Sequence, residues 1–377
     1  MQVLEQLNEH KRLALSGLDR LLSDNETIAG LAKRQVGLLT NHACTTCEGV
    51  PTSRALNNKL SDAGGGPIRL FTPEHGIQLS MRAGAAVNHG LDPLTGLPVY
   101  SLYKHGRLDD DATFGHIETL VIDLRDVGVR CYTYAATAAQ AAQKALEQNI
   151  DVIVCDRANP LGPGAEGPCP ESERRSLLAY FDIPFVHGHT ISELLATCIT
   201  QGKDDASYLV YPADIAGQAG LGWIPPSPAL SHPDAVAAYA GLVLLEATNI
   251  SEGRGSSASF RSVAAPDLDA LSLTAALAEW NTGFAAAPAV ITSMGGDQAG
   301  QPLPGIQIWP QRNMRKKPLS LGIHLLSWLR QEHSDFSWLP LQKNKSGSAI
   351  DNLFGHSDLR EKLNDGVSAD QIMAAWR

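Results

Sequence analysis

Residues 119–157 read TLVIDLRDVGVRCYTYAATAAQAAQKALEQNIDVIVCDR. The runs at the two ends, residues 119–126 and 151–157, are short and rich in Val, Ile and Leu, which is typical of strands buried on both faces of a parallel sheet. The Ala-rich middle consists of strong helix formers. Because two parallel strands need a crossover between them, this stretch predicts a βαβ unit.

Two further apolar runs, residues 36–41 and 68–76, extend the alternation toward the N-terminus. The pattern predicts an α/β fold with a Rossmann-like, doubly wound and mainly parallel sheet. After a Gly/Pro-rich passage the spacing becomes helical, with one short strand candidate at residues 289–294, which predicts a smaller α+β domain. We expect a first domain at residues 1–205 and a second domain at residues 206–377.

Length and composition limit the possible functions. The chain has 377 residues and 44% hydrophobic content, enough for two cores. Its 30 basic and 40 acidic residues give a net charge of −10 without a long basic run, which disfavours a nucleic-acid partner. No stretch predicts a membrane span or a signal peptide, so we expect a cytoplasmic protein, or a periplasmic or secreted one if a leader has been removed. The oligomeric state stays open.

The ends of the predicted strands carry polar residues. In open parallel sheets ligands bind beyond the carboxyl ends of the strands, so these side chains should converge on one rim. No GxGxxG motif follows any of the strands, and we therefore expect neither NAD nor another cofactor. The strand-end residues are Asn41, Glu74, His75, Asp123, Asp126, Asp156 and Arg157.

Glu74 and His75 lie together in LFTPEHGIQ, residues 70–78. A partly shielded carboxyl group at a strand end suits a general acid. The structural alternative is that Glu74 caps a helix and His75 packs in the core.

Two loops offer partners for this acid. Asp123, Asp126, Tyr132 and Tyr134 share one strand-to-helix connection with Arg130. Carboxylates beside tyrosines suit a sugar, but an Asp–Arg surface pair with core tyrosines fits equally well. The next loop carries Asn159 and Glu166, and Glu166 could pair with Glu74 because glycoside hydrolysis uses two carboxyl groups.

The remaining candidates are a histidine pair, a cysteine pair and a turn. His187 and His189 precede a helix that we expect Thr190 and Glu193 to cap; they could also bind a metal, which would make a metal-dependent hydrolase with His75 a weaker hypothesis. Cys44 and Cys47 form a CxxC that is more easily read as incidental thiols than as a zinc or redox site. The turn around residues 246–255 holds Glu246, Asn249, Glu252 and Arg254, where the guanidinium could bind an anion or be merely exposed.

Ten short segments together resemble one family, the exo-acting β-N-acetylmuramidases, a glycoside hydrolase family formerly catalogued as a domain of unknown function. In chain order they are VGLLTNHA, PEHG, GLPVYSLY, DVGVRCYTY, DRANPLG, EGP, HGHTISEL, PPSP, EATNISEGRG and IDNLFGHSDLREKL. The resemblance implies a glycosidase that removes terminal, non-reducing N-acetylmuramic acid from peptidoglycan fragments. It also implies that the Rossmann-like domain at residues 1–205 is catalytic and houses the site, that the domain at residues 206–377 is auxiliary, and that the active-site cleft lies between them.

The resemblance assigns roles to the candidate residues. Glu74 would protonate the glycosidic oxygen and His75 would orient it or contact the sugar. The second carboxyl would be Glu166, Asp126 or Asp123, in that order, unless the 2-acetamido group of the substrate replaces it. Arg254 or Arg157 would bind the lactyl carboxylate. The other expected sugar contacts are Asn41, Tyr132, Tyr134, Asp156, Asn159, His187, Ser227, Glu246, Asn249 and Glu252.

The chain departs from the family pattern at three positions. Ala85 stands where the family has the acid of "AGE", Ala229 where it has the Asn of "SPN", and Ala247 where it has the Gly of "EGTN". These changes keep open an alternative function, a non-catalytic protein that binds amino sugars or muropeptides.

Overall fold

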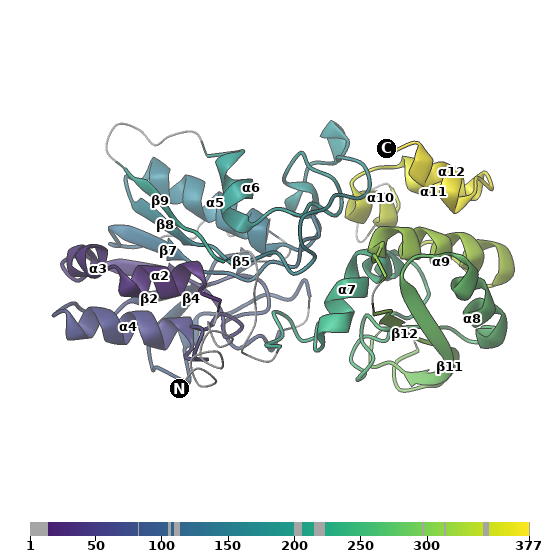
Figure 1. Cartoon of the computed structure of the whole chain (residues 1–377), viewed down its shortest axis with the longest axis horizontal. Helices are drawn as coiled ribbons and strands as arrows, with labels where there is room; N and C mark the ends of the chain where they lie inside the picture. The colour runs from purple at the N-terminus through teal and green to yellow at the C-terminus, as the bar shows by residue number, and fades with distance from the viewer. Residues whose placement is uncertain are drawn as a thin grey trace, which may run out of the picture. The chain divides into compact units, whose positions relative to one another are not determined.

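The computed structural model describes residues 14–81, 83–104, 107–108, 114–199, 206–214, 223–295, 298–312, 314–341 and 347–376 (Figure 1). Contacts divide the chain into two units. The first unit comprises Met1–Asp126, Thr133–Asn159 and His189–Pro228, and the second unit comprises Val127–Tyr132, Pro160–Gly188 and Ala229–Arg377. Contacts therefore divide the chain differently from the predicted boundary after residue 205, because residues 160–188 fold with the C-terminal part.

A seven-stranded sheet forms the middle of the first unit, in the order β3-β4-β2-β1-β7-β8-β9. All neighbouring strands are parallel except β3 and β4. The predicted, mainly parallel sheet is thus confirmed. Its strands are β1 (Val36–Leu39), β2 (Arg69–Thr72), β3 (Gly90–Leu91), β4 (Pro98–Ser101), β7 (Thr119–Ile122), β8 (Asp151–Cys155) and β9 (Tyr208–Tyr211), and a separate hairpin pairs β5 (Tyr103–Lys104) with β6 (Arg107–Leu108).

Helices cover both faces of this sheet (Figure 1). On one face α2 (Gly17–Ser23), α3 (Asn25–Leu31) and α4 (Thr52–Asp62) pack their leucines against alternate strand residues such as Leu38 and Val121. The other face carries α5 (Tyr134–Glu147), the predicted crossover between β7 and β8, and α6 (Ile191–Ala196). Each fully buried Leu or Val contributes about 1.5–3 kcal/mol, so this two-faced burial fixes the strands and with them the rim.

The second unit is built on a three-stranded antiparallel sheet in the order β10-β12-β11. This confirms the predicted α+β part of the chain. Its strands are β10 (Ser262–Ala264), β11 (Phe284–Thr292) and β12 (Pro302–Pro310). Its helices are α7 (Pro233–Leu242), α8 (Ala270–Glu279), α9 (Pro318–Glu332), α10 (Ala349–Phe354), α11 (Asp358–Asn364) and α12 (Ala369–Ala374), with short 3₁₀ turns η1 (Ser172–Arg174), η2 (Leu177–Ala179) and η3 (Val243–Ala247).

Arg130 is buried in the second unit, so the predicted Asp–Arg surface pair is wrong. Its guanidinium donates to the carbonyl oxygens of Pro168 at 2.9 Å and Ile183 at 2.7 Å, and also to that of Phe354. Burial lowers the pKa of Arg130 to about 10. Backbone carbonyls from distant parts of the chain accept from both terminal nitrogens of this cation, which ties residues 160–188 to the C-terminal helices.

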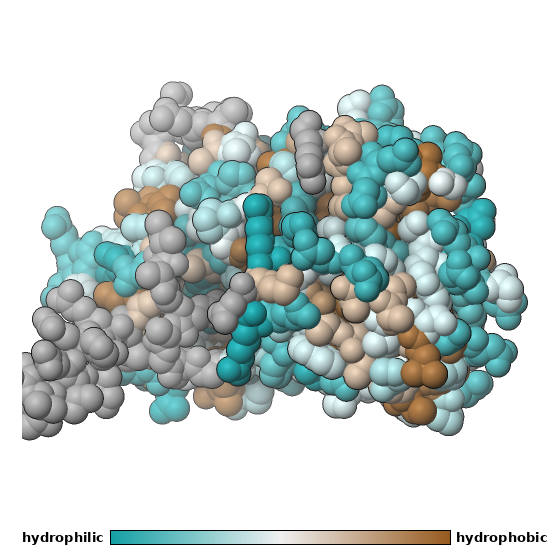
Figure 2. All heavy atoms as spheres, turned by 45° about the vertical axis from the view of Figure 1, so that its right-hand side comes forward, coloured by the Kyte–Doolittle hydropathy of each residue, from teal (hydrophilic) through white to brown (hydrophobic). Residues whose placement is uncertain are grey.

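The surface is mostly polar on the face shown in Figure 2, where brown atoms form small separate groups. The most exposed large apolar side chains are Leu271, Val290 and Leu91. Single exposed apolar residues are ordinary on folded proteins. Within the described part of the chain, no helix is both long and apolar enough to cross a membrane.

Helices α7 and α9 approach each other closely at two glycines, which makes their packing testable. A Cβ atom added at Gly322 would lie 2.5 Å from the Cα atom of Gly241. Overpacking of this kind typically costs about 1–3 kcal/mol, so Gly322→Ala should lower the free energy of unfolding by at least that amount. Urea unfolding followed by tryptophan fluorescence checks this, since five of the six tryptophans lie in the second unit.

The matched control is Gly30→Ala in α3, where an added Cβ meets no atom within 4 Å. That change should leave stability unaltered or raise it by about 0.4–1 kcal/mol. Equal stabilities of the two variants would contradict the tight helix contact.

Candidate active site

The carboxyl group of Glu74 is buried just beyond the end of β2. Its Oε1 accepts the backbone N–H of Gly84 at 2.6 Å and the hydroxyl of Tyr103 at 3.0 Å. Its Oε2 accepts the hydroxyl of Thr133 at 2.6 Å. Three separate segments thus fix one side chain, and the carboxyl group keeps a single orientation.

The backbone around Glu74 is held as firmly. Residues 74–79 form turns, so the alternative that Glu74 caps a helix is wrong. His75 has a φ of +69°, which a residue with a side chain rarely adopts, and its Nδ1 lies 2.7 Å from the carbonyl oxygen of Met81. The Tyr134 hydroxyl lies 3.2 Å from the carbonyl oxygen of Glu74 and 2.7 Å from that of Pro226, next to the buried Ser227. His75 and Tyr134 therefore support the Glu74 turn.

A buried ion pair joins the ends of β7 and β8. Arg157 Nε lies 2.5 Å from Asp123 Oδ1, and Nη2 lies 2.8 Å from Oδ2. Thr52 donates its hydroxyl to Asp123 at 2.6 Å, and Arg157 also donates to the carbonyl oxygen of Thr45. Burial opposes the charge of Arg157, but the Asp123 carboxylate outweighs it and holds the pKa of Arg157 above its ordinary value. The charges of these two predicted site residues thus compensate each other.

Three further rim residues form hydrogen bonds with other parts of the first unit. Asp156 accepts the N–H and the hydroxyl of Ser192 at the start of α6, at 3.2 and 2.7 Å. Asn159 donates to the carbonyl oxygen of His189 at 3.0 Å. Asn41 accepts the N–H of Ala43 at 3.1 Å, while its buried Nδ2 has no hydrogen-bond partner within the described ranges. Asp126 is buried as well.

Glu166 lies in the second unit. Its Oε2 accepts the N–H of Leu319, the second residue of α9, at 3.1 Å. Burial raises the pKa of Glu166 even though this hydrogen bond favours the charged form. The predicted pairing of Glu166 with Glu74 stays a prediction.

Two other predicted site residues of the second unit are enclosed by its core. Tyr132 packs edge-on against Tyr239 with ring centroids 6.0 Å apart. His187 is buried, and its N–H donates to the carbonyl oxygen of Gly128 at 3.1 Å.

The turn around Arg254 joins two carboxylates to one guanidinium. Arg254 pairs with Glu246 and, at 2.8 Å, with Glu252, and its Cζ lies 5.2 Å from the centroid of the Phe260 ring. Burial raises the pKa of Glu252 to about 7. Asn249 clamps a neighbouring loop, donating to the carbonyl oxygen of Asp335 at 2.7 Å and accepting the N–H of Ser337 at 2.8 Å.

The cysteine and histidine alternatives find no support in geometry. Cys44 and Cys47 are free thiols, and burial raises the pKa of both to about 11, which keeps them protonated and unreactive. His189 is exposed, and its Nδ1 lies 3.5 Å from the carboxylate of Glu193. The predicted capping of the following helix by Thr190 and Glu193 is confirmed. Among the described residues, no group of three or more His, Cys, Asp or Glu side chains could hold a metal ion.

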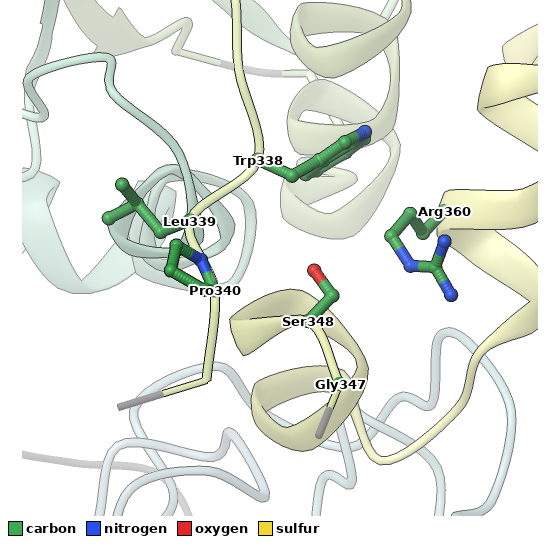
Figure 3. Close-up of a pocket in the computed structure, with 6 residues that line it drawn as sticks. All are labelled: Trp338, Leu339, Pro340, Gly347, Ser348 and Arg360. Atoms are coloured by element: carbon green, nitrogen blue, oxygen red, sulfur yellow. The ribbon is translucent and has the colours of Figure 1, made fainter. Parts of the chain in front are cut away.

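A hollow of about 360 Å³ opens on the second unit (Figure 3). The ring of Trp338 and the hydroxyl of Ser348 face it, and Arg360 is held at its side by Asp351, with both N–O distances 2.9 Å. None of the predicted site residues lines this hollow, so we keep the candidate active site at Glu74.

Thr133, Tyr103 and Gly84 contact Glu74 although the sequence analysis did not select them. A weak signal existed for two of them. Thr133 lies between the selected Tyr132 and Tyr134, and Tyr103 comes two residues after the end of β4, at the same edge of the sheet. Gly84 carried no signal, because its contribution is a backbone N–H.

Family comparisons match almost the whole chain. The family described as exo-β-N-acetylmuramidase NamZ matches with its N-terminal part over residues 36–234 and with its C-terminal part over residues 237–377. The chain belongs to the NamZ exo-β-N-acetylmuramidase family. The resemblance inferred from the ten segments is thereby confirmed, and the family is one of glycosidases.

A curated NamZ relative agrees with this assignment, and two solved structures share the fold. The peptidoglycan β-N-acetylmuramidase NamZ of Bacillus subtilis (strain 168) is 30% identical over 374 residues, which cover 96% of this chain and 87% of the relative. Two crystal structures of DUF1343 family proteins from Bacteroides fragilis share the fold. Their TM-scores are 0.80 and 0.68 at 24% and 21% identity, and each match covers 97% of this chain and 94% of the other.

The buried carboxyl of Glu252 makes stability depend on pH. Its folded pKa of about 7 exceeds the ordinary value of 4.5, so the folded state binds the proton more tightly than the unfolded state. The stabilisation is complete below about pH 4.5 and is lost as the pH rises to about 7. The wild type should therefore lose free energy of unfolding between pH 5 and pH 7.5, and Glu252→Gln should not. The difference in the free energy of unfolding between the variant and the wild type should shift by on the order of 2 kcal/mol in favour of the variant over this range.

Urea unfolding of both proteins at the two pH values measures this change. Glu246→Gln is the matched control, because it removes a carboxylate from the same guanidinium at a less buried position. A difference between Glu252→Gln and wild type that does not vary with pH would contradict the assignment.

Proposed function

We propose that this protein is an exo-acting glycosidase that releases terminal, non-reducing β-N-acetylmuramic acid from peptidoglycan fragments of the MurNAc-GlcNAc type, with Glu74 as the general acid. The observation that carries the proposal is the buried Glu74 carboxyl, oriented by three donors at the carboxyl edge of the sheet in a chain of this family. Such an edge is where open parallel sheets bind their ligands.

The three donors also select the oxygen that carries the acid proton. The N–H of Gly84 can only donate, so Oε1 has to remain an acceptor. A proton on Glu74 therefore sits on Oε2, facing Thr133 at 2.6 Å. A hydroxyl can donate to the ionised carboxylate or accept from the protonated acid, so Thr133 can serve both states by turning its proton.

The second catalytic group remains to be chosen among the predicted candidates. Asp123 is committed to Arg157 and is the least available of them. Glu166 and Asp126 remain, and the 2-acetamido group of the substrate is the alternative that needs no protein nucleophile. We propose that the second role falls to one of these three groups.

Replacing the acid tests the central assignment. Glu74→Gln keeps the shape and the contact with Gly84 but removes the acid proton, and general acid catalysis contributes about 10²–10⁴-fold. We expect the release of N-acetylmuramic acid from MurNAc-GlcNAc to fall by that factor while the affinity for the disaccharide is kept. Product release is followed by chromatography and affinity by calorimetry.

The same assay separates the two function classes. Glu26→Gln, which removes an exposed carboxylate of the first unit on α3, is a control for the loss of one negative charge. Binding of the disaccharide by wild type without any release would overturn the glycosidase proposal in favour of the sugar-binding protein. Equal rates for Glu74→Gln and wild type would remove Glu74 from the acid role.

The placement of the proton on Oε2 gives a second test. Thr133→Val should slow hydrolysis of MurNAc-GlcNAc, whose leaving group needs protonation, about tenfold or more. An aryl muramide with a leaving group that departs unprotonated should be much less affected. Thr133→Ser should behave as wild type, and Thr137→Val, the same change one turn later in α5, controls for damage to the helix. Equal losses on both substrates would show that Thr133 acts only through structure.

A further inference from the structure

Arg125 is a cation at the rim that no carboxylate of the described residues pairs with. It lies three residues beyond the end of β7, at the carboxyl edge of the sheet. Its Nε donates to the carbonyl oxygen of Ala43 at 3.3 Å, and its Cζ lies 5.9 Å from the centroid of the Trp223 ring. Both contacts leave the guanidinium without a counter-charge.

The two arginines predicted to bind the lactyl group differ from Arg125 in this respect. Arg157 already holds both oxygens of Asp123, so that pair is neutral. Arg254 is shared by Glu246 and Glu252. With Glu252 protonated that cluster is neutral, and with both acids ionised it carries a net negative charge, so in neither state is the positive charge of Arg254 left over for an anion.

The surroundings of Arg125 favour the binding of an anion. The charges of Asp123 and Arg157 balance each other, so this ion pair supplies no full counter-charge for Arg125. Burial, and after it the neighbouring Arg157 cation, lowers the pKa of Arg125, which reflects the cost of holding a positive charge at this position. A partly buried cation without an anion beside it has an unfavourable desolvation free energy, and a bound carboxylate would offset it.

We infer that Arg125 binds a carboxylate of the substrate and is the residue that selects muramic acid over glucosamine. The inference rests on the proposed function and replaces Arg157 and Arg254 in the lactyl role. Because Nε already donates to Ala43, the end-on nitrogens Nη1 and Nη2 would form the two parallel hydrogen bonds that a carboxylate accepts. The carboxylate comes either from the free lactyl group or from the first residue of a peptide stem.

Three aryl β-N-acetylmuramides separate these sources: one with a free lactyl carboxylate, one with a lactyl amide, and one whose lactyl group carries L-alanine with its own carboxylate. Wild type should prefer the free acid to the amide. On the free acid, kcat/KM of Arg125→Met should fall about ten- to a hundredfold, mainly because KM rises, which is the usual effect of losing one pair of charge-assisted hydrogen bonds. On the amide, kcat/KM of the variant should stay within a few fold of the wild-type value. On the free acid, kcat/KM of Arg125→Lys should lie between the values of wild type and Arg125→Met.

Arg20→Met is the matched control, because it removes an exposed cation of α2 whose charge is already paired with Asp214. A loss confined to the alanyl substrate would assign the carboxylate to the stem instead of the lactyl group and keep the inference. Equal losses on acid and amide, or no loss on any substrate, would overturn it.

A failure of the proposed function can be told apart from a failure of this inference. Calorimetric binding of N-acetylmuramic acid and of its lactyl amide to wild type and Arg125→Met repeats the comparison without turnover. Binding that depends on Arg125 in a protein that hydrolyses no muramide would overturn the glycosidase and retain the carboxylate site. Binding of acid and amide with equal affinity to both proteins would overturn the site even if muramides are hydrolysed.

Discussion

The fixed orientation of the Glu74 carboxyl is the constraint on which the site depends. A carboxyl group can protonate a glycosidic oxygen only if it points in one direction and keeps a known oxygen free to carry the proton. The loop at Gly84, the hairpin at Tyr103 and the N-cap of α5 at Thr133 supply the donors that fix it. These segments meet because parallel strands end at one edge of the sheet, so the fold itself assembles the acid.

A second interaction keeps that edge together. Asp123 and Arg157 follow adjacent strands, and their buried pair joins β7 and β8 where the sheet ends. Breaking such a pair would leave a buried charge uncompensated, at a cost of about 3–5 kcal/mol. We therefore read these two residues as the frame of the rim, while Arg125 beside them keeps its charge for a ligand. The different roles of these three charged residues follow from the partners of each side chain and not from their positions in the sequence.

The sequence predicted the parallel sheet, the crossover helix and the position of Glu74, because buried strands and strand ends leave local patterns. It did not predict the partners of Glu74, since Gly84 acts through its backbone and Thr133 through its place at the N-cap of α5. Arg130 was misread for a similar reason. Its three carbonyl partners lie between 38 and 224 residues away along the chain, and no local pattern encodes them. The inclusion of residues 160–188 in the second unit follows from the same long-range contacts.

The most direct test of the account is a crystal structure of the Glu74→Gln variant with MurNAc-GlcNAc bound. The account predicts the glycosidic oxygen within about 2.6–3.2 Å of the side-chain atom that replaces Oε2. It also predicts the lactyl carboxylate against Arg125. A disaccharide bound with its glycosidic bond beyond the reach of residue 74 would contradict the assignment of Glu74 as the acid.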